Sequence, residues 1–308
     1  MTTEQLLRAT DIEKRFDDQP VLQGIDLAVE PGEIVLLMGP NGVGKSVFMS
    51  CLAGSTAPDA GEIELFDGQS PIDARAETSV MLQGTMADPD LTGRENLRFY
   101  EDLHPRGTDE WQALAERLEL DADLDRLVRE YSGGMERKLE LASVLAADVP
   151  LYLLDEPTAE LDLTTIQTLH DLLLARRDAG KAFLVTSHTP LDARIADRIA
   201  FVQNGTVVAD GPPEELLGEL PEVVRVRGGV PEEERLLGER AFRRGDEVRG
   251  FLRGDDGVDA ISRSVSDDAS VELDPPSYTD LFNYHTYVRP AIDEGKGTGG
   301  RARKTVTN

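Results

Sequence analysis

The sequence is poor in several residue types, and each shortage excludes a class of protein. It holds one cysteine, Cys51, in 308 residues, so an internal disulfide framework is excluded. No apolar run approaches the ~20 residues of a membrane-spanning helix, and the longest, Ile34–Met38, is only as long as a strand. The first residues lack the basic and apolar regions of a signal peptide. We therefore expect a cytoplasmic protein.

Lysine is also scarce, and negative charge is in large excess. Only six of the 32 basic residues are lysines, and the net charge is −27. Such an excess repels nucleic-acid phosphates, so no nucleic-acid partner is expected. At low salt it also disfavours the folded state, because like charges are then poorly screened. A surface rich in carboxylates and poor in lysine resembles those of salt-adapted organisms, which predicts a halophilic protein; an ordinary acidic cytosolic protein is the alternative.

Strand and helix patterns alternate from about residue 5 to residue 215, which predicts an α/β core. Three apolar segments have the character of strands buried on both faces, namely Ile34–Met38, Leu151–Leu154 and Ala182–Thr186. The last two flank a helical pattern that begins at Asp162 and ends before Gly180. This order predicts parallel strands joined by a helical crossover.

Other segments depart from this alternation. Apolar stripes at helical spacing between Leu91 and Arg129 predict a helical insertion, and Asn204-Gly205 predicts a hairpin turn. After about residue 220, short alternating segments are interrupted by charged clusters, so we expect an accessory region over residues 221–290. Residues 291–308 are rich in glycine and lack an apolar pattern, which predicts a disordered tail.

A phosphate-binding loop is the strongest functional signal. The segment Gly39–Ser46 matches G-x-x-x-x-G-K-[ST] and lies between an apolar strand and a helical segment. Main-chain amides of such a loop, together with a helix N-terminus, surround phosphates. Lys45 is expected to hold the β- and γ-phosphates of ATP, and the Ser46 hydroxyl to ligate Mg²⁺. The residues expected to bind the nucleotide are Gly39, Pro40, Asn41, Gly42, Val43, Gly44, Lys45, Ser46 and Val47.

Two acidic residues end a buried strand farther along the chain. Asp155 and Glu156 follow Leu151–Leu154, which places them at the edge of the sheet where open α/β sheets bind ligands. Asp155 is expected to anchor Mg²⁺, and Glu156 to position or deprotonate the attacking water. Two acids after a strand often belong to a solvated loop, but the phosphate-binding loop favours the catalytic interpretation.

The segment Tyr131-Ser132-Gly133-Gly134-Met135 lies about 20 residues before Glu156. It resembles the signature motif of ATP-binding cassettes, with Tyr and Met in place of the usual first and last residues. In that family the motif completes the ATP site of a partner subunit, so the resemblance implies that Ser132, Gly133 and Gly134 contact ATP held by a second copy of the chain. A common Ser-Gly-Gly turn is the alternative.

Further residues resemble the family's site in the same order along the chain. Phe16 is similar to the aromatic that stacks on adenine, and Gln83 to the glutamine that contacts Mg²⁺ and the attacking water. Ala159–Asp162 resembles the loop that crosses the dimer interface, and His188 the histidine that contacts the γ-phosphate. Val47 departs from the pattern, because the family usually has a second hydroxyl residue there.

The resemblance implies an α/β fold with an ABC-type P-loop ATPase core over residues 1–220. It adds an antiparallel β subdomain, a helical subdomain at about residues 90–145 and a small C-terminal extension. Leu91–Leu97 and Pro276–Phe282 resemble segments of the ABC-2 or drug-resistance exporter branch, which implies a homodimeric ATPase, peripheral on the inner membrane face, that drives a separate permease.

Two alternatives stay open at this point. Soluble cassette ATPases usually carry two cassettes or a long coiled-coil insertion. Here 85 residues separate Ser46 from Ser132, and the sequence holds no second phosphate-binding loop. An importer ATPase shares every catalytic motif.

Overall fold

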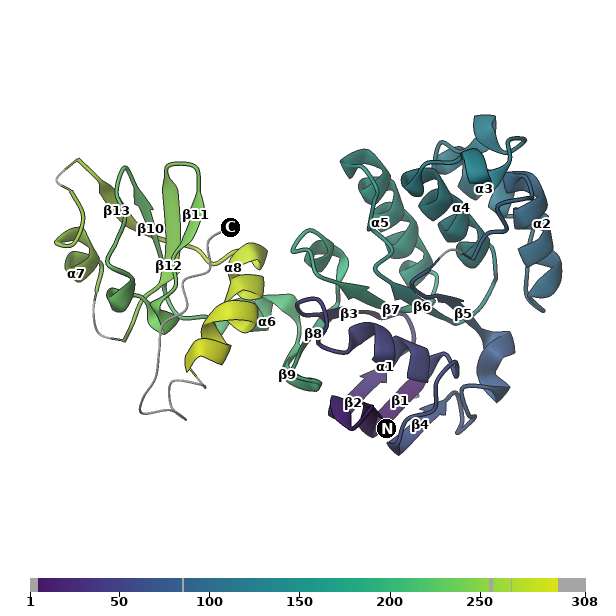
Figure 1. Ribbon diagram of the computed structural model, residues 1–308, viewed down its shortest axis with the longest axis horizontal. Coiled ribbons are helices and arrows are strands. Elements are labelled where there is room, and N and C mark those ends of the chain that lie inside the picture. The colour runs from purple at the N-terminus through teal and green to yellow at the C-terminus, as the bar shows by residue number, and fades with distance from the viewer. Residues whose placement is uncertain (1–4, 85, 255–256, 267, 293–308) are drawn as a thin grey trace. The chain divides into compact units, whose positions relative to one another are not determined.

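A computed structural model of the chain describes residues 5–84, 86–254, 257–266 and 268–292. It divides into two compact units between Pro213 and Glu214 (Figure 1). The first unit is built on a six-stranded sheet whose strands lie in the order β5 (Thr78–Met81), β6 (Leu151–Asp155), β7 (Ala182–Ser187), β3 (Ile34–Met38), β8 (Arg198–Gln203) and β9 (Thr206–Gly211).

All neighbouring strands of this sheet are parallel except β8 and β9, which form an antiparallel hairpin. Every residue of β3, β6 and β7 is buried, as expected of strands covered on both faces. The predicted α/β fold, the three apolar strands and the hairpin at Asn204-Gly205 are therefore confirmed.

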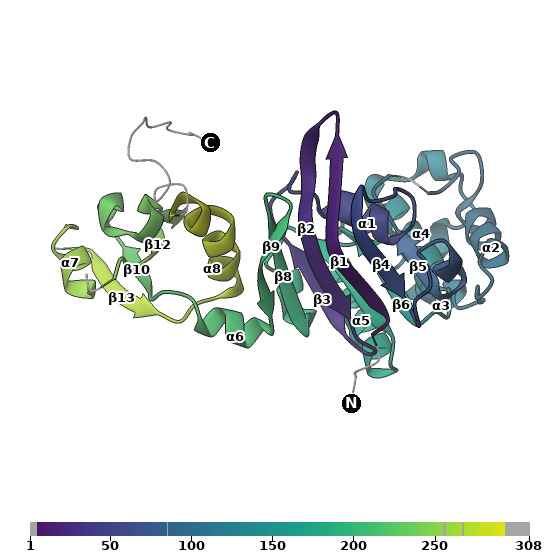
Figure 2. The same cartoon turned by 90° about the horizontal axis from the view of Figure 1, so that it is seen from below.

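One face of the sheet is covered by a second sheet and one helix. The second sheet is antiparallel and orders its strands β2 (Gln19–Val29), β1 (Leu7–Phe16) and β4 (Ala60–Leu65). Helix α1 (Lys45–Leu52) packs its buried apolar residues, Cys51 among them, into a hydrophobic cluster shared by both sheets. Figure 2 shows β1 and β2 as a long ribbon beside the strands of the main sheet.

Longer helices lie on the opposite face in Figure 1, namely α4 (Gly133–Leu145) and α5 (Leu163–Asp178). Asp162 caps α5 by accepting a hydrogen bond from the Thr165 amide at 2.8 Å, which confirms the predicted start of this helix. Beside α4 lie α2 (Gly93–Leu103), α3 (Trp111–Arg117) and two 3₁₀ turns, Asp121–Asp123 and Val128–Glu130. This group is the helical insertion predicted from the apolar stripes. Two further 3₁₀ turns in the first unit are Asp73–Glu77 and Asp192–Ile195.

The second unit contains a four-stranded antiparallel sheet in the order β11 (Phe242–Arg244), β12 (Glu247–Phe251), β10 (Val223–Arg227) and β13 (Ser270–Asp274). Its helical segments are α6 (Pro213–Gly218), α7 (Val258–Ser262), α8 (Tyr278–Asn283), a π-helical turn Tyr284–Val288 and the 3₁₀ turns Glu233–Arg235 and Leu237–Glu239. One cluster joins Ile261 of α7 to the sheet, and a second joins Val288 to Val223 and Phe251.

The segment Pro276–Phe282 is bonded to the sheet of the second unit through Asp280. Ser277 and Asp280 form a capping box at the start of α8. Asp280 also accepts hydrogen bonds from Arg249 of β12, at 3.1 Å from Nε and 2.8 Å from Nη2. Residues 291 and 292 continue the helix, and the rest of the predicted tail, 293–308, lies outside the described residues.

Candidate functional site

The loop between β3 and α1 brings the phosphate-binding residues to the edge of the sheet. Gly44 precedes α1 with φ of 106°, and a Cβ there would lie 2.8 Å from Leu22 Cδ2, so glycine is required. No side chain caps the helix at this point. The positive end of α1 therefore faces the loop, where it favours an anion.

Lys45 is buried within this loop. Its Nζ donates hydrogen bonds to the carbonyl oxygens of Gly39 and Pro40, at 2.7 and 3.0 Å. Burial lowers the pKa of Lys45, and the charges of Glu156 and Asp155 act in the opposite direction. An anion in the loop adds a partner for a cation that is already removed from water, so the site favours phosphate.

The two predicted acids differ sharply in their surroundings. Asp155 is buried at the end of β6, and its Oδ1 accepts a hydrogen bond from Thr186 Oγ1 at 2.5 Å. Among the described residues, Asp155 Oδ2 is buried without a hydrogen-bond partner. A buried carboxylate oxygen of this kind is costly unless something binds it. The geometry fits a cation at Oδ2.

Glu156 lies at the turn out of β6 in an unusual conformation. Its φ is 50°, a region that non-glycine residues enter at a cost of order 1–3 kcal/mol and that is often found at functional sites. Its amide donates to Thr186 Oγ1 at 2.8 Å, and its Oε1 lies 3.2 Å from Nδ1 of the exposed His188. The Glu156 carboxylate and the His188 ring thus form one polar pair.

A cavity of about 560 Å³ joins the loop to the acid. It brings together Lys45, Ser46 and Glu156, which the sequence motifs predicted, and Gln83, which the family resemblance implied. The complete lining is Val21, Asn41, Gly42, Gly44, Lys45, Ser46, Val47, Gln83, Arg137, Glu156, Ala159 and Glu160.

Ser132 and Phe16 are not among the residues that line this cavity. Ser132 caps α4, and a Cβ at the following Gly133 would lie 1.9 Å from Glu160 Oε2. The signature glycine therefore permits close contact with the loop Ala159–Asp162. Phe16 ends β1 with 49% of its surface exposed, and Lys14 Nζ lies 5.6 Å from its ring centre. An exposed ring is available for stacking.

The motif analysis missed three groups near the site. Thr186 binds both acids, as described above. Asp192 is buried and accepts hydrogen bonds from Ser187 and Thr158 at 2.6 and 2.9 Å, and it lies 2.9 Å from His170 Nε2. The third group pairs Arg137 with buried Glu140. Polar residues inside apolar strands and helices were the available signal, because buried polar groups need partners.

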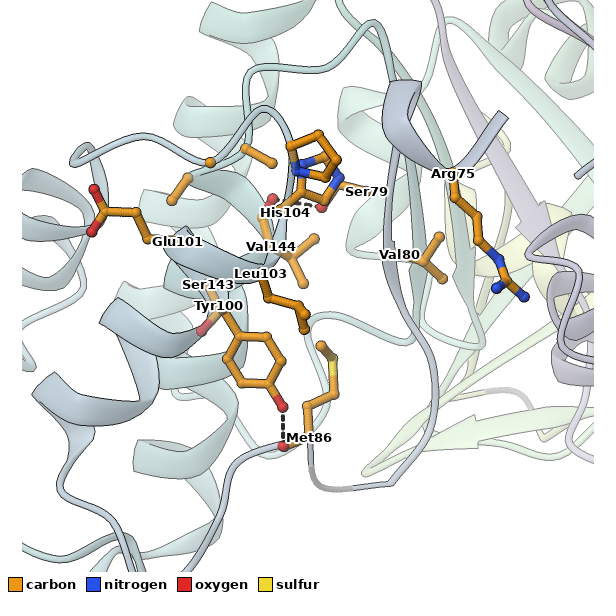
Figure 3. Close-up of a pocket in the computed structure, with 14 residues that line it drawn as sticks. Arg75, Ser79, Val80, Met86, Tyr100, Glu101, Leu103, His104, Ser143 and Val144 are labelled. Carbon is orange, nitrogen blue, oxygen red and sulfur yellow. Dashed lines mark hydrogen bonds between the residues drawn. The ribbon is translucent and has the colours of Figure 1, made fainter. Parts of the chain in front are cut away.

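A second cavity, of about 280 Å³, lies between β5 and helices α2 and α4 (Figure 3). Its wall includes Val80, Met86, Tyr100, Leu103 and Val144. Leu103 and its neighbour on α2, Phe99, expose 63% and 52% of their surfaces. This part of the helical group therefore presents apolar side chains to solvent.

Known proteins resemble the chain over most of its length. The family model described as ABC transporter matches residues 22–159. A Nod factor export ATP-binding protein I from Rhizobium etli is 36% identical over 245 residues, which cover 76% of this chain and 78% of the relative.

Solved structures share the fold. A structure described as an ATP-binding subunit of an ABC transporter is 26% identical with a TM-score of 0.64, covering 70% of this chain and 92% of that one. A dimeric bacterial ABC transporter cassette, MJ0796, has a similar fold, with 23% identity and a TM-score of 0.62 over 67% and 98% of the two chains.

Proposed function

Because the chain belongs to the family of ABC transporter ATP-binding proteins, which hydrolyse ATP to power transport, we propose that it is the ATPase subunit of an exporter. The observation that carries this proposal is the cavity in which the phosphate-binding loop meets Gln83 and Glu156. The Rhizobium etli relative is named for export, which favours an exporter over an importer. The substrate is selected by a permease on a separate chain.

The residues present fit Mg²⁺. Asp155 offers a buried carboxylate oxygen with no described partner, and Ser46 stands at the start of α1 beside the loop. Asp155 and Ser46 would hold Mg²⁺ together with phosphate oxygens of the nucleotide and water. When bound, Mg²⁺ neutralises charge that develops on the phosphates.

Hydrolysis then follows from the placement of the side chains. Lys45 turns from the loop carbonyls to the phosphates, and Gln83 orients the attacking water from the cavity wall. Glu156 takes the proton from that water, while His188 holds the Glu156 carboxylate from its 3.2 Å position and faces the γ-phosphate. Phe16 stacks on the adenine ring.

A second copy of the chain completes the site. Ser132 does not line the cavity that contains Lys45 of the same chain, yet it begins a helix whose N-terminus suits phosphate. Two chains that meet head to tail place Ser132, Gly133 and Gly134 of one on the ATP of the other. Hydrolysis removes the γ-phosphate contact, and the two chains separate.

We assign the permease contact to the apolar cavity near α2. Exposed Leu103 lines it, Phe99 is exposed one turn earlier on α2, and Met86 connects the cavity to the segment that follows Gln83. Among the described residues, no helix is long and apolar enough to cross a bilayer. The permease therefore supplies the membrane spans, and the chain binds to the cytoplasmic face of the membrane through it.

Two further properties belong to the proposal. The net charge of −27 supports a protein adapted to high salt, where screening weakens the repulsion between carboxylates. Residues 221–290 act as an accessory region, because they have hydrophobic clusters of their own.

The test uses two variants of the full chain. Lys45→Ala removes the buried ammonium and should abolish ATP binding. Glu156→Gln keeps a hydrogen-bonding side chain without its basic carboxylate, so turnover should fall about 10²–10⁴-fold while ATP-bound dimers accumulate. Steady-state ATPase assays and size-exclusion chromatography with light scattering, with and without MgATP, measure both. A Lys45→Ala protein with wild-type turnover would contradict the site. A Glu156→Gln protein that stays monomeric in saturating MgATP would contradict the dimer.

A further inference from the structure

The main chain just after Gln83 is held by side chains of two helices. The Met86 amide donates to Glu140 Oε1 of α4 at 3.0 Å, and the Tyr100 hydroxyl of α2 donates to the Met86 carbonyl. Figure 3 shows Tyr100 directed at this carbonyl. Two residues on, the Asp88 amide donates to Asn96 Oδ1 at 2.8 Å, and Asn96 Nδ2 donates to the Asp88 carbonyl at 3.0 Å.

Four main-chain groups of this short segment are thus bound by Glu140, Tyr100 and Asn96. Glu140 and Asn96 are buried, so water competes poorly for these hydrogen bonds. Because all three side chains belong to α2 and α4, any displacement of those helices moves the segment with them. The segment behaves mechanically as part of the helical group.

Glu140 also reaches toward the ATP cavity. Its second oxygen, Oε2, lies 3.0 Å from Nη1 of Arg137, one turn earlier on α4. Arg137 in turn lines the cavity with Lys45 and Glu156. One buried carboxylate therefore connects a cation of the ATP cavity to the main chain that follows Gln83.

A terminal phosphate in the cavity competes with Glu140 for this arginine. A guanidinium carries five N–H donors in a fork that suits phosphate as well as carboxylate. Charge-assisted bonds to either group are about twice as strong as neutral ones. When Arg137 turns to phosphate, the charge on Glu140 loses compensation, and the Met86 amide becomes the stronger partner of that carboxylate.

We propose that Arg137 and Glu140 form a relay through which the terminal phosphate of ATP tightens the hold of α4 on the Met86–Asp88 segment. The relay rests on the ATP site proposed above and adds a route from that site to the helical group. Arg137 and Glu140 are positioning residues in it: Arg137 detects phosphate, and Glu140 passes the change to the Met86 amide.

Hydrogen–deuterium exchange of the full-length protein tests the relay on a peptide that spans Met86–Asp88. Exchange is compared between MgADP and Mg²⁺ with β,γ-imido-ATP, and binding of both nucleotides is measured on the same samples. In the wild type, the Met86 amide should exchange about fivefold more slowly with the triphosphate, a factor that corresponds to one hydrogen bond of ordinary net strength.

Three variants distinguish a nucleotide-dependent relay from a purely structural role of Arg137 and Glu140. Arg137→Met should bind the triphosphate more weakly, because it loses the proposed phosphate contact. At saturating nucleotide, Arg137→Met and Glu140→Gln should both lose the difference in exchange between the two nucleotides, whereas Arg137→Lys should recover part of it. The matched control is Arg94→Met on α2, which removes an exposed ion pair with Asp125 of 2.7 Å and should keep the full difference.

The outcomes distinguish the two proposals. A wild-type protein that binds neither nucleotide overturns the proposed function and the relay together. Nucleotide binding with equal exchange in MgADP and in the triphosphate overturns the relay alone. The relay alone is also overturned if the Met86 peptide of the Glu140→Gln protein responds to the triphosphate as the wild type does.

Discussion

Replacing Thr186 with valine tests whether the two acids of the site depend on one hydroxyl. Thr186 is fully buried in β7. Its Oγ1 donates to Asp155 Oδ1 and accepts from the Glu156 amide, at 2.5 and 2.8 Å. Valine has nearly the same shape, so Thr186→Val removes both hydrogen bonds without opening a cavity.

The size of the effect follows from these two contacts. A hydrogen bond to a charged group contributes about 1.5–3 kcal/mol, and one to a neutral amide about 1 kcal/mol. Asp155 Oδ2 already lacks a partner among the described residues, so the variant leaves both carboxylate oxygens unpaired. We expect the variant to lose about 3 kcal/mol of interaction free energy, divided between folding stability and catalysis. If the whole loss appeared in catalysis, it would correspond to a rate decrease of roughly 100-fold.

Turnover should therefore fall about 10- to 100-fold, and the Mg²⁺ concentration at half-maximal rate should rise. ATP affinity should change little, because Lys45 and the phosphate-binding loop keep their contacts. Mg²⁺ titrations of steady-state ATPase activity, with thermal melts of the same samples, measure the two components. Thr186→Ser is the matched control, since it keeps the hydroxyl and should stay close to the wild type. A Thr186→Val protein within twofold of the wild type in both measurements would refute this reasoning.

Three further predictions concern charge and the second unit. The melting temperature should rise from dilute buffer to molar salt, because the screening length falls from about 10 Å at 0.1 M to about 3 Å at 1 M; a flat or falling trend would contradict salt adaptation. Burial, together with the charge of Arg289, lowers the pKa of His285 to about 4. The unfolded chain then binds a proton more readily, so stability present at pH 7 is lost between about pH 6.5 and 4. Urea titrations should show that the unfolding free energy falls by about 3 kcal/mol across this pH range, and this fall should be absent in His285→Gln. Asp280→Asn weakens the buried pair with Arg249 and should lower the unfolding free energy by about 3 kcal/mol; an unchanged denaturation midpoint would show that the pair is not stabilising.

The sequence predicted the central strands better than the outer sheet, for a physical reason. Strands β3, β6 and β7 are covered on both faces, so they appear as unbroken apolar runs. In β1, alternation is broken by a bulge between Ala9 and Ile12, where Asp11 has φ of 51°. A bulge shifts the side chains that follow to the other face. The pattern analysis therefore missed this strand, and only the family resemblance implied an antiparallel subdomain.

Helix α4 begins at Gly133, directly after the cap Ser132. Glycine disfavours a helix interior by about 1 kcal/mol, so local preference alone does not predict a helix that starts with Gly133 and Gly134. A Cβ at Gly133 would lie 1.9 Å from Glu160 Oε2, so glycine at this position permits the observed contact with the Glu160 side chain.

The site residues likewise fall into those that the sequence predicted and those whose roles depend on contacts between distant parts of the chain. Sequence motifs predicted Lys45 and Glu156, the family resemblance implied Gln83, and the structure places all three around one cavity. Thr186 was missed because its role depends on register: β6 and β7 are parallel, and Asp155 stands opposite Thr186 in that pairing. Glu140 contacts Met86 across 54 positions of the chain. Such contacts depend on strand order and helix packing, which no local pattern contains.

Val47, the departure from the family pattern in the phosphate-binding loop, has a physical explanation in the fold. Its side chain is half-buried and packs against the hydrophobic cluster beneath α1 while lining the proposed ATP cavity. A hydroxyl at this position would contribute a hydrogen bond to the nucleotide, about 1 kcal/mol net. A valine buries apolar surface worth up to about 1.5 kcal/mol whether or not nucleotide is present. Val47 therefore stabilises the empty site as well as the occupied one, and weakens ATP binding only by the missing bond. In the proposed site, the buried ammonium of Lys45 and the N-terminus of α1 would supply the larger part of the electrostatic attraction for phosphate, because charge interactions are strongest away from water.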